Sequence, residues 1–208
     1  MEVTVRSAPY APSGDRRPAN PSTDRRLVEQ SHLIKRALEA SVLLSLYPRC
    51  RIEIDVIVLS DDGGRLCAAI NAATLALVDA GVPVRDMVCA CSAGLVQGAG
   101  PDGEDVEIVD LNRVETMGDN RGGGGGGGGA VHLPCASMPQ RGTVVLAQCE
   151  SRIPAETFER VLAAAVDGCA AVHEVMSTAV RERAASLLAA RNGNATVEVG
   201  NVGVVGVR

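Results

Sequence analysis

The sequence predicts an α+β domain in which strands and helices are arranged in layers. Segments with alternating apolar and polar residues, typical of half-buried strands, are separated by segments whose apolar residues repeat with the period of a helix. Hydrophobic residues make up 46% of the 208 residues, which is enough to fill a core, but aromatic residues make up only 1%. The core must therefore be filled mainly by Val, Leu, Ile and Ala.

The first quarter of the chain is expected to form a strand, a helix and a second strand. Residues 3–8 (VTVRSA) alternate as in a strand and are followed by a loop rich in Pro and Ser. Helical spacing of apolar residues then runs up to Pro48, and Thr23 or Asp24 can cap the start of this helix. Residues 51–59 alternate again, which indicates a half-buried strand.

The rest of the chain continues this pattern. A helix of small and apolar residues is expected at about 65–80, followed by a hairpin of 86–96 with 105–111 and a second hairpin within 130–150. A long amphipathic helix is expected from 154 to about 190. Its apolar positions are Phe158, Val161, Leu162, Ala165, Val172, Val175, Met176, Val180, Leu187 and Leu188.

A glycine tract interrupts the second half. The eight consecutive glycines 122–129 cannot pack, so residues 118–130 are expected to be a flexible insert. The tract is no phosphate loop, because no Lys-Ser/Thr follows and a strand comes next. We expect one domain over 1–191 and a C-terminal tail over 192–208, for which an added edge strand and a disordered end are both open.

The charge is distributed unevenly. The net charge is −5, yet residues 1–51 hold nine Lys and Arg against five Asp and Glu. This quarter is the region best suited to a polyanion, although a solvated basic helix and loop would show the same pattern. The seven Cys include no C-x-x-C motif, which indicates buried free thiols in a reducing compartment and no metal site. No stretch approaches the ~20 apolar residues of a membrane span, so no membrane partner is expected.

The segment DGGRLCAAINAATLALVDAGVPVRDMVCACSAGLV, residues 62–96, resembles the signature region of the RNase PH family. The resemblance extends over about 2–190 and is strongest to the RNase PH-like subunits of the six-membered exosome ring, in the group of the archaeal catalytic subunit and its eukaryotic descendants. It implies the RNase PH fold, which is like that of ribosomal protein S5 domain 2. Family members begin with additional strands that are not seen here, so either the gene model is short or part of the sheet is missing. A sheet without these strands has an exposed edge, and then a partner covers the edge or the chain is poorly stable alone.

The resemblance also implies that the catalytic site is degenerate. Active members cleave RNA with inorganic phosphate and carry an Arg two positions after Asp-Gly-Gly, where this chain has Leu66. Arg65 stands one place early, and a one-residue shift turns a helical side chain by about 100°, so Arg65 is expected to point elsewhere. The catalytic Asp corresponds to His132, which could act as a general base only in principle. Gly63 and Gly64 are then expected to serve the backbone geometry of a tight connection rather than anion binding.

The predicted function is therefore that of a catalytically inactive ring subunit without a cofactor. Arg25 and Arg26 match a paired-Arg position that faces the RNA channel in the family, and Arg16, Arg17 and Arg65 are further candidates for RNA binding. Expected partners are other RNase PH-like subunits, cap subunits, RNA and an associated nuclease, in the nucleus, nucleolus and cytoplasm. The alternatives are an active phosphate-dependent 3′-to-5′ exoribonuclease, a donor of residues to a neighbour's site, and a stand-alone RNA-binding protein.

Overall fold

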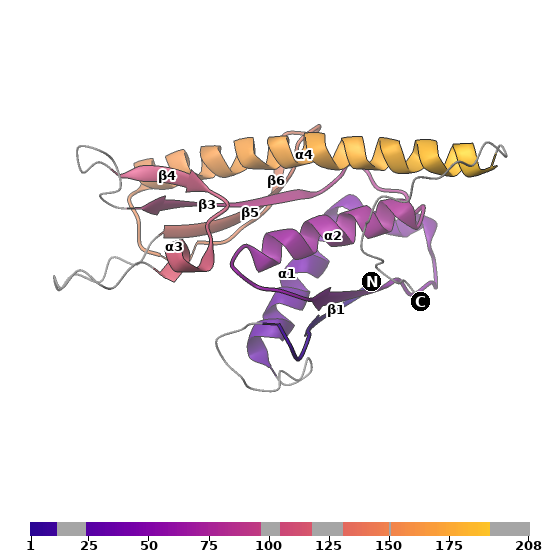
Figure 1. Cartoon of the computed structure of the whole chain (residues 1–208), viewed down its shortest axis with the longest axis horizontal. Coiled ribbons are helices and arrows are strands. Elements are labelled where there is room, and N and C mark those ends of the chain that lie inside the picture. Colours follow the sequence, from indigo (N-terminus) through magenta and orange to yellow (C-terminus); the bar gives the residue numbers. More distant parts are fainter. Residues whose placement is uncertain (12–23, 97–104, 118–130, 150, 192–208) are drawn as a thin grey trace.

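The computed structural model of the chain (Figure 1) describes residues 1–11, 24–96, 105–117, 131–149 and 151–191. The expectations for Arg16, Arg17, the glycine insert and the C-terminal tail lie outside the described residues.

The described strands form two sheets. β1 (Glu2–Ser7) and β2 (Glu53–Val58) pair in parallel. The second sheet is antiparallel, with the strand order β4-β3-β5-β6. Its strands are β3 (Cys89–Val96), β4 (Val106–Val109), β5 (Val131–Met138) and β6 (Thr143–Ala147). Both expected hairpins are confirmed, β3 with β4 and β5 with β6.

The described residues form four α-helices that pack on the sheets. They are α1 (Arg25–Ser41), α2 (Arg65–Asp79), the short α3 (Arg113–Met117) and α4 (Ala155–Arg191), and a 3-10 turn, η1 (Leu44–Leu46), follows α1. Figure 1 shows α4 along one face of the four-stranded sheet, with α2 and α1 on the other side. This mixed architecture confirms the predicted α+β class.

The alternation of side chains along β3 separates two cores. Cys89, Cys91 and Leu95 face α4, whereas Val88 and Ala90 pack with α1, α2 and the β1–β2 sheet. Successive strand residues point to opposite faces, so β3 can serve both cores at once.

The side chain of Asn71 on α2 is bonded to the backbone of β3. Its Nδ2 donates to the carbonyl of Ala90 at 2.9 Å, and its Oδ1 accepts from the amide of Ala90 at 2.7 Å. One turn later, the hydroxyl of Thr74 donates to the carbonyl of Val88 at 3.0 Å. β4 pairs only with Ala93–Val96 of β3. The Asn71 side chain therefore satisfies backbone groups of β3 that β4 does not reach. These bonds hold α2 against the sheet.

All seven cysteines are free thiols, and five of them are buried, as expected from the sequence. Burial raises the pKa of Cys67 and that of Cys89 to about 12, and the pKa of Cys91 to about 11. These thiols are therefore protonated at neutral pH and act as small apolar side chains.

Gly168 allows α4 to lie close to the sheet. A Cβ at this position would meet Cys91 Sγ and a methyl group of Val109, each at 2.9 Å. Val161, Ala165 and Cys169 on the same helix are fully buried.

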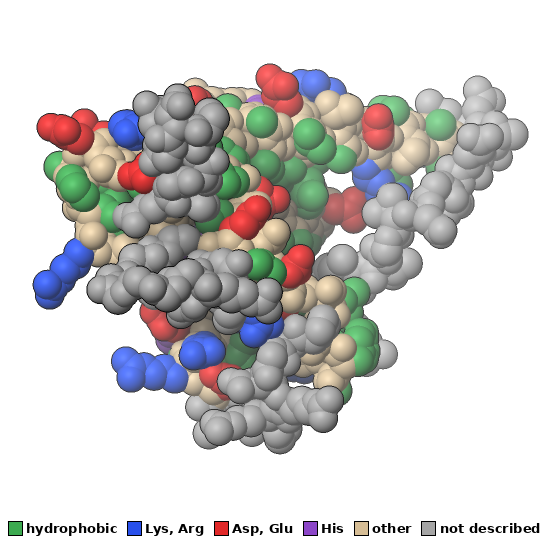
Figure 2. Space-filling model, turned by 60° about the vertical axis from the view of Figure 1, so that its left-hand side comes forward, with side chains coloured by type: hydrophobic (Ala, Val, Ile, Leu, Met, Phe, Trp, Pro, Cys, Tyr) green, Lys and Arg blue, Asp and Glu red, His purple; other side chains and the backbone are tan. Residues whose placement is uncertain are grey.

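The other end of α4 differs from the sequence expectation. All residues from 181 to 191 are exposed, and the predicted core positions Val175, Leu187 and Leu188 are 71%, 50% and 58% exposed. A 37-residue helix is about 55 Å long and therefore outruns strands of eight residues, which span about 27 Å. Apolar side chains are visible along α4 at the top of Figure 2.

α4 also corrects the expectation that no segment has the properties of a membrane span. By length and composition alone it is long and apolar enough to cross a membrane, and it is the one such helix in the part of the chain that the structure describes. Its first half packs on the four-stranded sheet.

α1 begins as predicted but ends earlier. Asp24 caps the helix by accepting from the amide of Arg26 at 3.0 Å. The helix stops at Ser41, because the next residues pair with the 83–85 segment: the Leu43 amide donates to the Pro83 carbonyl, and the Arg85 amide donates to the Ser41 carbonyl. Leu46, which lies in the segment expected to be helical up to Pro48, is consequently 60% exposed.

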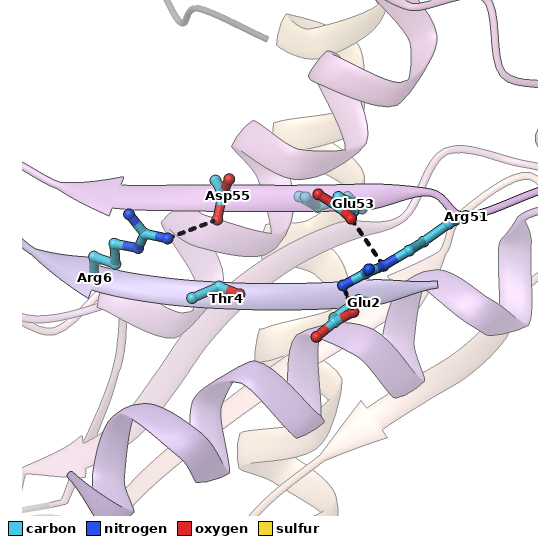
Figure 3. Close-up of a pocket in the computed structure, with 7 residues that line it drawn as sticks. Glu2, Thr4, Arg6, Arg51, Glu53 and Asp55 are labelled. Atoms are coloured by element: carbon cyan, nitrogen blue, oxygen red, sulfur yellow. Dashed lines mark hydrogen bonds and ion pairs between the residues drawn. The ribbon is translucent and has the colours of Figure 1, made fainter. Parts of the chain in front are cut away.

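The outer face of the β1–β2 sheet carries charged side chains that pair with one another (Figure 3). Arg51 lies between Glu2 and Glu53, with Nε 2.8 Å from the Glu53 carboxylate, and Arg6 pairs with Asp55 at 3.7 Å. The shallow cavity between these residues has a volume of about 200 Å³. Its arginines are already neutralised, which leaves this face poorly suited to anions.

Replacing Asn71 by Leu is expected to destabilise the protein by about 2–4 kcal/mol, because it leaves two buried backbone groups of Ala90 without partners. Chemical denaturation measures the change. The control is Ala72→Ser, at an exposed position of the same helix, which should shift the free energy of unfolding by less than about 0.5 kcal/mol. Equal stabilities of Asn71→Leu and the wild type would show that the Ala90 bonds do not hold α2.

Candidate functional site

A cavity of about 610 Å³ lies where α1, the β2–α2 turn, α3 and the end of β6 approach β5. Its walls include Arg26 from α1, Gly63 and Gly64 from the turn, Arg113 from α3 and His132 from β5. Segments distant in the sequence therefore meet here, and four of them supply charged or titratable side chains.

The Asp62-Gly63-Gly64 turn is fixed by a close backbone contact. Gly63 has φ +117°, and a Cβ there would lie 2.7 Å from the carbonyl oxygen of Leu111. The Arg113 amide donates to the Asp62 carbonyl at 2.5 Å. Gly64, at φ +58°, is the N-cap of α2. Both glycines thus serve the backbone geometry, as predicted.

The first residues of α2 all line the cavity. Arg65 and Leu66 contribute adjacent parts of the wall, and the Arg65 guanidinium pairs with Asp61 at 3.3 Å. The expectation that Arg65 points elsewhere is therefore wrong. Its long side chain folds back toward the turn through the pair with Asp61, which offsets the rotation between neighbouring helical positions.

Arg113 was not predicted from the sequence. A reciprocal capping box fixes α3: Glu115 accepts from the Asn112 amide at 2.8 Å, and Asn112 accepts from the Glu115 amide at 2.9 Å. This box places Arg113 at the first helical position, beside the turn. The motif Asn-x-x-Glu was the signal that could have revealed it. Figure 2 shows Lys and Arg side chains gathered on the lower left of the molecule.

The carboxylates in the cavity are few. Asp61 pairs with Arg65, and Glu29 lies exposed on α1. Among the described residues, Arg26 and Arg113 form no ion pair, so their charges are available to a ligand. No group of three or more metal-ligating side chains occurs within the described ranges.

Comparison with known proteins decides the family. A family model described as "3′ exoribonuclease family, domain 1" (RNase PH) matches residues 1–83. The exosome complex component Rrp41 of Nitrosopumilus maritimus is 35% identical over 183 residues, which cover 88% of this chain and 67% of that protein. The chain belongs to the RNase PH family.

Other relatives agree. The human exosome complex component RRP41 is 38% identical over 178 residues, covering 85% of this chain and 65% of that protein. The RRP41 homologue of Arabidopsis thaliana is 39% identical over 175 residues, covering 84% of this chain and 65% of that protein. The chain thus spans slightly less than two thirds of the length of these RNase PH family members.

A solved structure shows the same fold. The structure of rice Rrp46 matches with a TM-score of 0.62 over 86% of this chain and 73% of that one, at 19% identity. The predicted RNase PH fold is confirmed.

Of the residues singled out from the sequence, the structure brings Arg26, Arg65, Leu66 and His132 together around the cavity. Arg25 is exposed at the start of α1 but does not line the cavity. Leu66 and His132 thus line the same cavity, and their correspondence to the family's catalytic positions stays a prediction.

Asp86 and Asp79, which lie outside the cavity, have structural roles. Asp86 is buried and accepts from the amides of Met87 at 2.7 Å and Arg141 at 3.2 Å, which ties the start of β3 to the β5–β6 turn. Asp79 pairs with Arg183 at 3.3 Å and joins the ends of α2 and α4.

Replacing Gly63 by Ala is expected to destabilise the protein by at least about 2 kcal/mol, because the new Cβ would be both strained and in contact with the Leu111 carbonyl. The matched control is Gly142→Ala, whose φ is +63° with open space around it, and which should cost only about 1 kcal/mol. Thermal unfolding of both variants tests the difference. If the two variants were equally stable, the close contact would have no energetic weight.

Proposed function

We propose that this chain is a non-catalytic subunit of an exosome core ring that threads RNA toward a nuclease elsewhere. The similarity to proteins named exosome complex components supports its place in such an assembly. Neighbouring RNase PH-like subunits, cap subunits and an associated nuclease are the proposed partners.

The composition of the cavity is the observation that carries the proposal. Phosphorolysis needs cationic groups to hold phosphate and a carboxylate for proton transfer or metal binding. Leu66 supplies an aliphatic side chain and His132 an imidazole at the positions concerned. The Asp61 carboxylate in the cavity is neutralised by Arg65. The cavity is therefore able to hold RNA but poorly equipped to cleave it.

Exposed apolar side chains offer surfaces for ring neighbours. They lie on the end of β2, on β4 and α3, and along α4. The exposed residues in these places include Ile57, Leu59, Val109, Val114, Val175, Leu187 and Leu188. Large exposed apolar residues are typical of protein–protein contact sites when they gather in patches.

A second candidate function is the donation of arginines to a neighbour's phosphorolytic site. Arg26 and Arg113 favour it, because both line the cavity and neither is neutralised by an ion pair within the described residues.

The purified ring, incubated with RNA and inorganic phosphate, is expected to release no nucleoside diphosphates from this subunit's site. Chromatography of the products measures the release. Diphosphate release that is lost in His132→Ala would establish catalysis by this chain, and release lost only in Arg113→Ala would establish the second candidate. A monomeric elution profile with full RNA affinity would instead support a stand-alone RNA-binding protein.

Arg25 and Arg26 are proposed to contact the RNA backbone in the channel. The double variant Arg25→Glu/Arg26→Glu should weaken RNA binding for all sequences alike, and should reduce the slope of log affinity against log salt by about 1.4, because two phosphate contacts are lost. The matched control is Arg181→Glu/Arg191→Glu on the exposed end of α4. Unchanged affinity and slope in Arg25→Glu/Arg26→Glu would overturn the assignment.

A further inference from the structure

We propose that Ser186, near the end of α4, is a phosphorylation site for an arginine-directed serine/threonine kinase, and that its phosphate draws Arg183 away from Asp79 on α2. The proposal is independent of the cavity and of RNA binding. The step uses ATP: a bond forms between the terminal phosphorus and Ser186 Oγ, the bond from that phosphorus to ADP breaks, and the hydroxyl proton passes to the base of the kinase.

The residues around Ser186 carry two positive charges at fixed distances. Residues 181–187 read RERAASL, which places Arg181 five positions and Arg183 three positions before the serine, with Leu187 directly after it. Kinases choose substrates by such charge patterns, and guanidinium groups bind the carboxylates of an acidic groove through paired hydrogen bonds. Ser186 is the only Ser or Thr of the 208 residues with Arg at both positions.

The whole segment is open to solvent. Figure 1 shows the yellow C-terminal end of α4 beyond the four-stranded sheet. Residues 181–191 are exposed throughout, and the last buried residue of α4 is Met176. The Ser186 hydroxyl donates to the Arg183 carbonyl at 2.8 Å, and this bond is exposed. The Arg183 side chain is 62% exposed, and Arg181 forms no ion pair among the described residues. A kinase can therefore reach the hydroxyl and both guanidinium groups.

The end of α4 can also leave the helix, which recognition requires. Each residue turns by about 100°, so Arg181 and Ser186 lie about 140° apart around the helix axis and do not face one groove together. Residues 181–191 bury no side chain, so their unfolding leaves both cores intact. Short helical segments without tertiary packing are marginal in water, and they open locally at little cost.

Thr116 on α3 is the comparison within the chain, because Arg113 stands three positions before it. Its hydroxyl donates to the Asn112 carbonyl at 2.8 Å, and Asn112 belongs to the capping box that fixes α3. The position five residues before Thr116 is Leu111, which is buried and carries no charge. Among the described residues, the arginine pattern and a free segment thus coincide at Ser186.

A phosphate on Ser186 would compete with Asp79 for Arg183. The two paired side chains are 62% and 56% exposed, so their ion pair is weak. Ser186 lies three residues after Arg183 on the same side of the helix, and a phosphoserine carries about −1.5 to −2 charges at pH 7. A cation placed before its anion supports a helix less than the reverse order does. Phosphorylation therefore loosens the end of α4 from α2.

The first test incubates the full chain with ATP and the catalytic subunit of a cyclic-nucleotide-dependent kinase, which is arginine-directed. Mass spectrometry of the peptides is expected to place the phosphate on Ser186, and Ser186→Ala should lose it. The matched control is Ser177→Ala, which should keep it. Ser177 lies on the same helix and donates to the Glu174 carbonyl at 2.9 Å, but no Arg stands three or five positions before it. Phosphate elsewhere with Ser186 unmodified would overturn the proposal.

Arg183→Gln should lower the rate of Ser186 phosphorylation at least about tenfold, because a charged hydrogen bond to the kinase is lost. The variant also loses the pair with Asp79, which makes the segment easier to open, so a lower rate cannot come from the fold. Arg191→Gln removes one charge from the same exposed end and should leave the rate unchanged. Equal rates in Arg183→Gln and the wild type would overturn the proposal, as would equal modification by an acid-directed kinase.

Amide hydrogen exchange tests the release of Arg183. Residues 183–191 are expected to exchange about two- to fivefold faster in the phosphorylated chain, which is the range that loss of an exposed ion pair allows. Ser186→Ala treated with the same kinase and ATP is the control and should show no change. Unchanged exchange in the phosphorylated wild type would overturn the competition between the phosphate and Asp79.

Discussion

The arrangement of the molecule depends on the two hydrogen bonds between the Asn71 side chain and the backbone of Ala90. They satisfy the backbone of β3 on the side that β4 does not reach. α2 contacts both cores, so fixing its position on β3 also fixes the distance between the two sheets. The N-terminus of α2, and with it the wall of the cavity, is placed by contacts two turns away from the cavity.

The cavity depends equally on a close approach of backbones. Gly63 brings the β2–α2 turn against the Leu111 carbonyl, and the capping box of Asn112 and Glu115 then sets Arg113 beside that turn. These contacts fix the geometry of the strand-to-helix connection in this member of the RNase PH family.

Local periodicity predicted most of the fold, because alternation along β2 and β3 and the cap at Asp24 are properties of neighbouring residues. The end of α1 could not be predicted in this way, since bonds to the distant Pro83 segment stop the helix at Ser41. Of the candidate site, Leu66 and His132 were reached through family resemblance. Arg113 was not predicted, because its place in the cavity depends on the backbone hydrogen bond between Arg113 and Asp62. These two residues lie about fifty positions apart along the chain.

The last three turns of α4 have a further consequence. Residues 181–191 are exposed, so among the described residues helix propensity and one exposed contact with α2, the pair of Arg183 with Asp79, keep them helical. Amide hydrogen exchange along this segment should accordingly be graded, fastest at Arg191 and slower toward Met176, instead of following global unfolding. Because this part of α4 is already helical, the docking of a neighbouring protein on it costs little conformational entropy of α4.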